Sequence, residues 1–153
     1  MIIDTQTGPF CIGILSGELV CKFSSSLEVM PPPERWVKLL RRYFAGEKID
    51  FSHAPLPKGS PFVQKCWIAC REIPHGETIT YGELAQAAGS PRAARAAGQA
   101  MRRNPMPVMT PCHRVIAASG KLHGFAGNTF PNSKELRTKR FLLALEQPHF
   151  ERV

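Results

Sequence analysis

The sequence predicts a small α/β domain over residues 1–55, followed by a mostly helical domain over residues 56–153. Two short apolar runs flank a Ser-Gly pair near the N-terminus, and a stretch rich in Pro, Ser and Gly over residues 52–60 is expected to link the domains. Beyond it, apolar residues recur at helical spacing between capping signals. A length of 153 residues fits one domain, or two small ones that share an interface.

A hairpin followed by one helix is predicted for the first domain. Residues 10–15 and 19–23 are the two apolar runs, and Gly17 suits the tight turn between them. The three prolines of residues 31–33 end this unit, because proline fits neither a helix interior nor a central strand. A helix is then expected from residue 34 to the stop signal at Gly46. Its apolar face comprises Trp36, Leu39, Leu40, Tyr43 and Phe44.

Two capped helices are predicted to open the second domain. The first starts at Ser60, which precedes a proline, and ends before the Pro-His-Gly sequence of residues 74–76. Its buried stripe comprises Phe62, Val63, Cys66, Trp67, Cys70 and Ile73. A capping box made of Thr80 and Glu83 opens a shorter helix that ends at Gly89.

A third helix is expected to start directly at Ser90-Pro91 and to run to about Arg103, before Asn104-Pro105 breaks it. Two helices joined by a Gly-Ser turn, the second rich in Ala and Arg, are typical of a helix-turn-helix. Its small residues would allow a close approach to DNA, and they are Ala93, Ala94, Ala96 and Ala97. A tight helix–helix contact in an ordinary bundle would favour the same alanines, so both interpretations stay open.

The C-terminal part is predicted to complete a winged helix with one extra helix. Short strands at 108–109 and 115–116 flank a Thr-Pro-Cys-His-Arg sequence, and a turn at Ser119-Gly120 leads into residues 121–125. The last helix spans about residues 133–146. The leucines that it buries are Leu136, Leu142, Leu143 and Leu145.

The net charge of +8 is concentrated in one part of the chain. No carboxylate occurs between Glu83 and Glu135. The basic residues of that stretch include Arg92, Arg95, Arg102, Arg103, Arg114 and Lys121. Such one-sided charge favours binding to a polyanion, with nucleic acid as the better candidate than a merely solvated basic face.

The composition also indicates in which cellular compartment the protein is expected. No apolar run approaches the length of a membrane span, and the N-terminal residues lack the basic start of a signal peptide. Five cysteines without framework spacing favour a reducing compartment. We therefore expect a cytoplasmic protein, or a nuclear one in a eukaryote, with no membrane partner.

Cys112 is the candidate nucleophile. It is followed by His113 and Arg114, and a thiol near cationic groups has a lowered pKa. His113 is a plausible base, and Glu146 could orient its imidazole as the third member of a triad. A lone cysteine is more often a small buried hydrophobe, which is the alternative.

No metal or cofactor is predicted. The sequence has no C-x-x-C or H-x₃-H pair, and Cys66 and Cys70 lie on an apolar stripe. A structural zinc could use Cys11, Cys21 and His53 only if the fold brings them together. Glycine-rich nucleotide loops are absent, so no site for a diffusible methyl donor is expected.

Four motifs resemble those of the O6-alkylguanine-DNA alkyltransferases. They are the sequence TPCHRVI of residues 110–116, RAARAAG of residues 92–98, Asn104-Pro105 and Tyr81-Gly82. The resemblance spans about residues 61–146. It implies a small ribonuclease H-like N-terminal domain and a winged helix-turn-helix C-terminal domain.

The resemblance also implies the reaction. A monomer binds duplex DNA that contains O6-alkylguanine, or O4-alkylthymine, through the minor groove and flips the damaged base out of the stack. Cys112 then takes the alkyl group irreversibly, without a cofactor, and each molecule acts once. Chemistry on a base requires such extrusion, which costs a few kcal/mol.

Residue roles follow from the matched motifs. His113 deprotonates Cys112 through a bound water, Glu146 holds His113, and Asn104 braces the turn. Tyr81 crowds the target phosphate and donates to the leaving guanine, while Arg95 fills the vacated place in the base stack as a minor-groove wedge would. The DNA backbone is contacted by Tyr81, Gly82, Ser90, Ala94 and Ala118. The base pocket is formed by Met101, Pro107, Val115, Phe125 and Ala126.

Two departures from the family pattern concern the pocket. Residues 128–133 insert into a loop that is commonly shorter, and Phe125 stands where a tyrosine is common. The preferred size of the alkyl group is therefore left open.

Two other functions are weighed against repair. A lesion-binding relative would lack the nucleophilic cysteine, and a redox-sensing winged-helix regulator would not need His113 and Glu146 behind Cys112. The presence of Cys112, and of His113 and Glu146 with it, favours the transferase.

Overall fold

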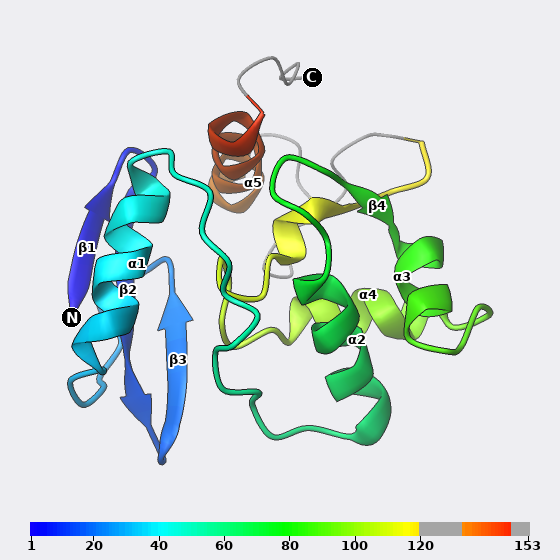
Figure 1. Ribbon diagram of the computed structural model, residues 1–153, viewed down its shortest axis with the longest axis horizontal. Helices are drawn as coiled ribbons and strands as arrows, with labels where there is room; N and C mark the ends of the chain where they lie inside the picture. Colours follow the sequence, from blue (N-terminus) through cyan, green and yellow to red (C-terminus); the bar gives the residue numbers. More distant parts are fainter. Residues whose placement is uncertain (120–132, 148–153) are drawn as a thin grey trace.

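The computed structural model describes residues 1–119 and 133–147 and has a small N-terminal sheet followed mainly by helices (Figure 1). Strands β1 (Ile2–Thr5), β2 (Gly8–Leu15) and β3 (Glu18–Lys22) form an antiparallel sheet with β2 in the centre, and helix α1 (Glu34–Phe44) lies beside it. The elements that follow are α2 (Pro61–Arg71), β4 (Ile79–Thr80), α3 (Tyr81–Ala87), α4 (Ala94–Arg102), the 3-10 helix η1 (Cys112–Arg114), β5 (Val115–Ile116) and α5 (Lys134–Glu146). The predicted order, a sheet with one helix followed by a mainly helical part, is confirmed at this level.

The predicted hairpin is confirmed as β2 and β3. Ser16 and Gly17 both have positive φ, at 51° and 81°, which matches the two-residue turns that follow the twist of a hairpin. Strand β1 was not predicted, and it pairs with β2 from Ile2 opposite Cys11 to Thr5 opposite Gly8. Its sequence has two apolar residues followed by two polar ones, so it lacks the alternation that marks a strand.

Helix α1 has the predicted bounds. Its fully buried residues are Trp36, Val37, Leu40 and Tyr43, while Leu39 and Phe44 are half-buried. The Phe10 ring packs edge-on against Phe23 and Phe44, with centroids 4.8 and 5.3 Å apart. These aromatic contacts fix the helix against the sheet.

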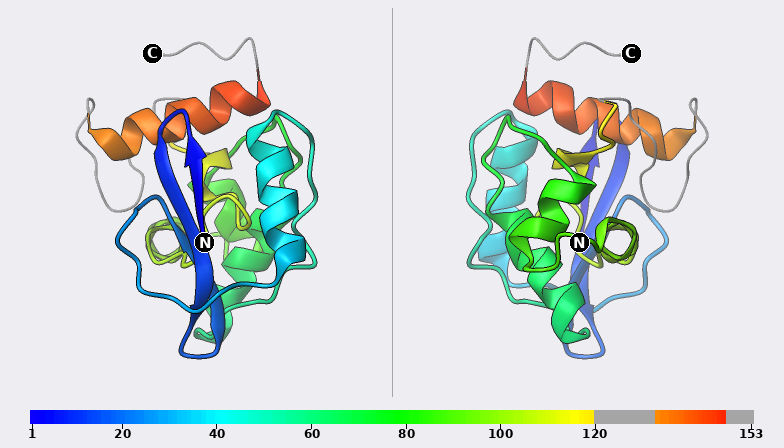
Figure 2. Two further views of the ribbon diagram at one scale, coloured as in Figure 1. Left: turned by 90° about the vertical axis from the view of Figure 1, so that its left-hand side faces the viewer. Right: turned by 90° about the vertical axis from the view of Figure 1, so that its right-hand side faces the viewer.

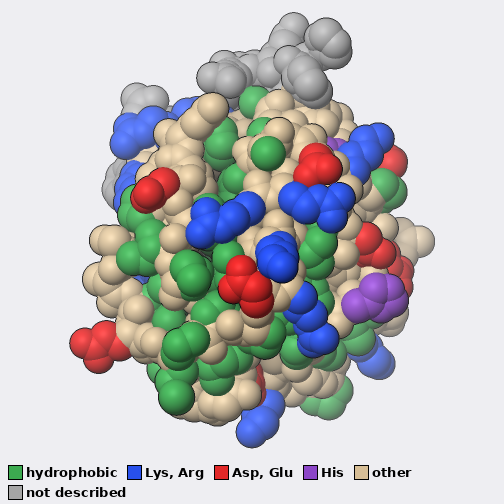
Figure 3. Space-filling view, turned by 60° about the vertical axis from the view of Figure 1, so that its left-hand side comes forward, with side chains coloured by type: hydrophobic (Ala, Val, Ile, Leu, Met, Phe, Trp, Pro, Cys, Tyr) green, Lys and Arg blue, Asp and Glu red, His purple; other side chains and the backbone are tan. Residues whose placement is uncertain are grey.

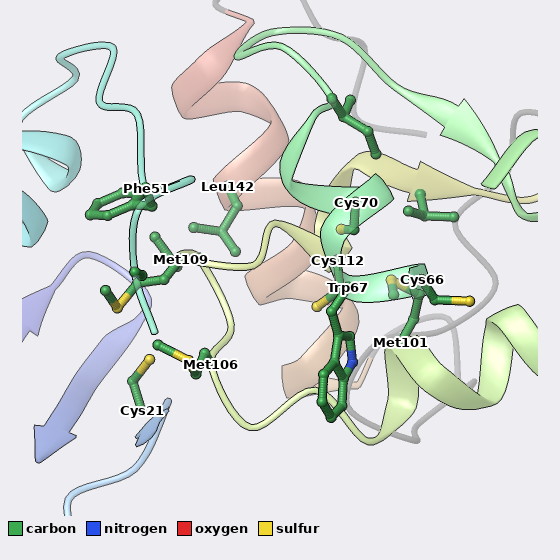
Figure 4. Packing of buried hydrophobic residues seen from close by; sticks show 14 of the residues in the cluster. Cys21, Phe51, Cys66, Trp67, Cys70, Met101, Met106, Met109, Cys112 and Leu142 are labelled. Carbon is green, nitrogen blue, oxygen red and sulfur yellow. The ribbon is translucent and has the colours of Figure 1, made fainter. Parts of the chain in front are cut away.

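The segment expected to be a linker is packed against the rest of the chain. Phe51, Ala54 and Pro57 are buried. The Arg71 guanidinium on α2 donates to the carbonyl oxygens of Ala54 and Pro55. One continuous core therefore joins the two parts, and Figure 4 shows Cys21 and Phe51 facing the loop that carries Met106 and Met109.

Helices α2 and α3 begin where their capping signals predict. The Ser60 hydroxyl accepts from the Val63 N–H, and Thr80 and Glu83 form the reciprocal capping box. The predicted stripe on α2 is buried from Cys66 onward, whereas Phe62 and Val63 are half-buried.

The predicted start of the third helix is wrong by several residues. Helix α4 begins at Ala94, because Ser90-Pro91 forms a turn in which the Ala93 N–H donates to the Ser90 carbonyl at 2.9 Å. Proline suits the second position of such a turn as well as the first turn of a helix.

The predicted strand at 108–109 is also wrong. Val108 has a φ of 75°, and the Thr110 N–H donates to the Met106 carbonyl at 2.8 Å, so this stretch is a closed turn. Strand β5 is confirmed at 115–116, and it pairs in parallel with β4, which was not predicted. Long-range pairing leaves little local signal in strands of two residues.

The last helix is confirmed and lies across the top of both parts in Figure 2. Leu136, Leu142 and Leu143 are buried, and Leu145 is half-buried. The predicted features of residues 120–132, including the wing and most of the insertion, lie outside the described residues. Within the described residues, no helix is long and apolar enough to cross a membrane.

Surface charge differs from one part of the molecule to another. The face in Figure 3 carries Lys and Arg side chains with Asp and Glu among them. On α1, for example, exposed Arg42 pairs with Glu47 at 2.9 Å. Helix α4 and the turns beside it lie in the stretch of sequence without carboxylates, so this part of the chain contributes only positive charge.

Candidate active site

Cys112 opens the 3-10 helix η1 and is 8% exposed. Its N–H donates to the Thr110 carbonyl at 2.8 Å, and the Arg114 N–H donates to the Pro111 carbonyl at 2.9 Å. The thiol is therefore carried by a tight, hydrogen-bonded bend between the preceding turn and β5.

Asn104 holds the turn that precedes this bend. Its side-chain amide donates to the Thr110 carbonyl at 2.8 Å, and its Oδ1 accepts from the Met106 N–H at 2.9 Å. Arg71 adds a third tie, because its Nε donates to the Thr110 hydroxyl at 2.9 Å. Both ends of the turn are thus fixed by side chains, those of Asn104 just before it and Arg71 from α2.

His113 and Glu146 form a buried pair behind Cys112. The His113 Nε2 and the Glu146 Oε2 lie 2.6 Å apart, and the two side chains are 0% and 1% exposed. A carboxylate only accepts hydrogen bonds, so Nε2 carries the hydrogen and Nδ1 keeps its lone pair. The Nδ1 atom is buried and has no hydrogen-bond partner among the described residues.

The Glu146 carboxylate has further donors. Arg114 donates through Nε to Oε1 at 2.7 Å and through its terminal nitrogen to Oε2 at 3.0 Å. Tyr43 on α1 donates its hydroxyl to Oε2 at 2.6 Å. Burial would raise the pKa of Glu146, but His113 and Arg114 outweigh it and hold that pKa well below its usual range.

His113 is a neutral imidazole at physiological pH. Burial lowers its pKa, and the attraction of Glu146 only partly opposes this effect. A neutral ring with a free Nδ1 lone pair is the form that accepts a proton.

The expected lowering of the Cys112 pKa is wrong for the unbound protein. Burial raises the pKa of the thiol, and the opposing effects of Asn104 and Lys139 are smaller. A protonated thiol is a weak nucleophile, so a base has to remove its proton.

Lys139 is a site residue that the sequence interpretation missed. Its side chain is buried, its Nζ donates to the Val115 carbonyl at 2.8 Å, and burial lowers its pKa to about 8 despite the attraction of Cys112. The available signal is spacing, because Lys139 and Glu146 share the buried face of α5 with Leu136 and Leu143. Charged residues on such a face rarely serve packing alone.

Tyr81 and Gly98 meet where α3 and α4 pack together. Tyr81 is half-buried, and burial together with the nearby Cys112 raises the pKa of its phenol. A Cβ atom built on Gly98 would lie 3.7 Å from the Tyr81 ring. Tyr81 therefore lies at the contact of α3 and α4, close enough to Cys112 to feel its charge, and its hydroxyl stays protonated.

The residues expected to contact DNA come from α3, from α4, from the turn between them and from the segment after β5. Gly82, Arg95 and Ala118 are exposed, and Ser90 and Ala94 are half-buried. Arg95 is on the first turn of α4.

A cavity of about 530 Å³ opens beside Cys112. Met101 and Pro107 line it as expected, whereas Val115 is fully buried and is not part of its lining. Strand β3 contributes Cys21, which was not predicted for the pocket. Phe125 and Ala126 lie outside the described residues.

Cys11, Cys21 and His53 are not brought together as a zinc site. Within residues 1–119 and 133–147, no group of three His, Cys, Asp or Glu side chains is placed to hold a metal ion. Cys11 and Cys21 are buried in neighbouring strands, and His53 is exposed.

Comparison with known proteins gives concordant matches. The family profile described as 6-O-methylguanine DNA methyltransferase, DNA binding domain, matches residues 61–148. A methylated-DNA–protein-cysteine methyltransferase of Methanosarcina acetivorans is 39% identical, over 95% of this chain and 96% of that protein. The crystal structure of Mycobacterium tuberculosis OGT in complex with DNA is 38% identical and has a TM-score of 0.80, over 96% of this chain and 91% of that one. An O6-methylguanine-DNA methyltransferase from Pyrococcus kodakaraensis is 27% identical with a TM-score of 0.66, over 96% and 97% of the two chains.

Replacing Lys139 should slow the reactions of Cys112. Lys139→Met keeps the length of the side chain and removes the charge that lowers the pKa of the Cys112 thiol. Labelling of Cys112 by iodoacetamide at about pH 7.5, followed by peptide mass, should be about three- to tenfold slower. Arg137→Met, on the exposed side of the same helix, is the control and should label at the unsubstituted rate. Equal rates for all three proteins would contradict an electrostatic role for Lys139.

Proposed function

The chain belongs to the 6-O-methylguanine DNA methyltransferase family, and from that membership we propose that it repairs O6-alkylguanine in duplex DNA by moving the alkyl group to its own Cys112. The observation that carries this assignment is the buried thiol followed in sequence by a neutral His113, whose Nε2 bonds to Glu146 and whose Nδ1 has no partner among the residues that the structure describes. A protein that only reads DNA has no use for a base behind a cysteine.

The reaction balances without a cofactor. The Cys112 sulfur forms a bond to the alkyl carbon while the bond between that carbon and the guanine O6 breaks. The proton that the thiol loses ends on the guanine that leaves. A thiol and an O6-alkylguanine therefore become a thioether and guanine. The thioether has no route back to a thiol here, so each molecule reacts once. The same displacement would act on O4-alkylthymine.

The site residues divide this work between them. His113 takes the thiol proton through a water on Nδ1, and Glu146 stabilises the imidazolium that forms. Asn104 holds the bend that presents the thiol, and the protonated Tyr81 hydroxyl donates to the leaving guanine. Because the free thiol has a raised pKa, this transfer is what activates it.

DNA is proposed to lie against α3, α4 and the turn at Ala118. Exposed Arg95 would enter the base stack, and Tyr81, Gly82, Ser90 and Ala94 would follow the backbone from the minor groove. The flipped base would occupy the cavity lined by Met101 and Pro107, and Phe125 and Ala126 are expected to complete it. The positive charge of this stretch supports binding to phosphate.

The finer fold assignment is part of the same proposal. Residues 1–55 would form a ribonuclease H-like domain and residues 56–153 a winged helix-turn-helix domain, with α3 and α4 as its two helices. The protein would act as a monomer. Because its substrate is DNA, it would act in the cytoplasm of a microbe or in the nucleus of a eukaryote.

The two other functions are not favoured. A reader of lesions that does not repair them needs no nucleophile, yet Cys112 is present and is followed by His113, whose ring pairs with Glu146. A redox-sensing regulator needs a thiol that ionises readily, whereas burial raises the pKa of Cys112.

Intact mass tests the transfer directly. After incubation with a duplex that carries one O6-methylguanine, the protein should gain a single methylene, mapped to Cys112, and saturate at one per molecule. Cys112→Ala should gain nothing and still bind DNA, because it leaves the surface of α4 unchanged. A methyl group on another residue, or transfer by the alanine variant, would contradict the assignment of Cys112 as the acceptor.

The proposed wedge is tested by Arg95→Ala. Loss of the side chain that fills the vacated stack should slow repair in duplex DNA about tenfold and leave the reaction with free O6-alkylguanine base unchanged. Arg41→Ala, on the exposed face of α1, is the control for a lost surface charge. Equal losses with duplex and free base would contradict the role of Arg95.

A further inference from the structure

A residue of the N-terminal part reaches into the proposed thiol-activating network. Tyr43 lies in the last turn of α1 and is 0% exposed. Its hydroxyl donates to the Glu146 Oε2 at 2.6 Å, across 103 positions of the sequence. Figure 2 shows how this is possible, since the C-terminal ends of α1 and α5 lie next to each other.

Tyr43 and His113 share one carboxylate oxygen. The His113 Nε2 lies 2.6 Å from the same Oε2 that accepts the Tyr43 hydroxyl. A donor on that oxygen draws charge away from it and fixes the direction of its lone pairs. The hydroxyl therefore acts on the bond that orients the imidazole, although it does not touch Cys112.

Packing alone does not explain the hydroxyl. The Tyr43 ring makes edge-on contacts with Phe44, Phe51 and His75, with centroids 5.3, 6.1 and 6.2 Å apart, and a phenylalanine ring would make the same contacts. A buried hydroxyl costs free energy unless it is hydrogen-bonded, and the Tyr43 hydroxyl bonds to Glu146. Burial and the Glu146 charge raise the pKa of Tyr43 well above its usual value, so it remains a donor.

We propose that Tyr43 is a positioning residue for the proposed reaction, which turns the Glu146 carboxylate toward His113 and limits its pull on the imidazole. The inference rests on the proposed function and adds to it that the N-terminal part helps to keep His113 a neutral base.

The direction of the effect follows from the shared oxygen. Without the Tyr43 hydroxyl, Oε2 carries more negative charge and stabilises the His113 imidazolium more strongly, so the pKa of His113 rises. The other charged or titratable groups around the network are Arg114 from η1, Lys139 from α5, His75 after α2, and Lys48, which acts on His75. Tyr43→Phe changes none of them, so a shift reports on the hydroxyl.

The test is the pH dependence of Cys112 labelling by iodoacetamide, which needs no DNA. In Tyr43→Phe, the midpoint of the acid limb should move to higher pH by about one pH unit, in keeping with the loss of one hydrogen bond to a charged group. Val37→Ala is the matched control, because Val37 is buried on the same helix and makes no hydrogen bond to Glu146 through its apolar side chain. It should lower stability and leave the midpoint in place.

An unmoved midpoint in Tyr43→Phe, or an equal shift in Val37→Ala, would overturn the role of Tyr43. Methyl transfer from DNA by the unsubstituted protein is measured alongside. A shifted midpoint without any transfer would support the network and reject the proposed function. Methyl transfer with an unmoved midpoint would support the proposed function and reject the role of Tyr43 in the network.

Discussion

The buried carboxylate of Glu146 is the group on which the rest of the structure depends. A charge in the interior is tolerated only when it is paired and fully hydrogen-bonded. Its donors include Tyr43 from α1, His113 and Arg114 from η1, and the Gly76 N–H before β4. Satisfying one carboxylate therefore ties the first helix, the nucleophile bend and the last helix together. The contacts that hold the fold are in this way the contacts that set the tautomer of His113.

This arrangement explains how the Cys112 thiol stays unreactive until it is needed. Burial keeps Cys112 protonated, and a protonated thiol reacts slowly with oxidants and stray electrophiles. The base beside it is neutral and its Nδ1 is unengaged among the described residues. In a protein whose nucleophile reacts only once, a thiol that is activated inside the site is more useful than one that is always ionised. Lys139 reduces the cost of the thiolate without eliminating the need for the base.

Local signals predicted most of the helices, and hydrogen bonds that the spacing of apolar residues does not reveal account for the turns that were missed. Helices α2, α3 and α5 have side-chain caps, and α1 has an apolar face between a proline run and a glycine, so the existence of all four could be predicted. The turn at Val108 and the start of α4 could not, because hydrogen bonds from Asn104 and within the Ser90 turn override the local pattern. Cys112, His113 and Asn104 are marked by their motifs. Tyr43 looks like one more apolar position on a helix, and only its contact with Glu146 shows otherwise.

The protonation state of His113 in the unbound protein tests this account most directly. Nitrogen-15 NMR of the two ring nitrogens near neutral pH distinguishes both neutral tautomers from the imidazolium. The carboxylate on one side and the burial of the ring predict a hydrogen on Nε2 and none on Nδ1. A hydrogen on Nδ1, alone or together with Nε2, would mean that His113 has no lone pair for the Cys112 proton, and would contradict the proposed activation of the thiol.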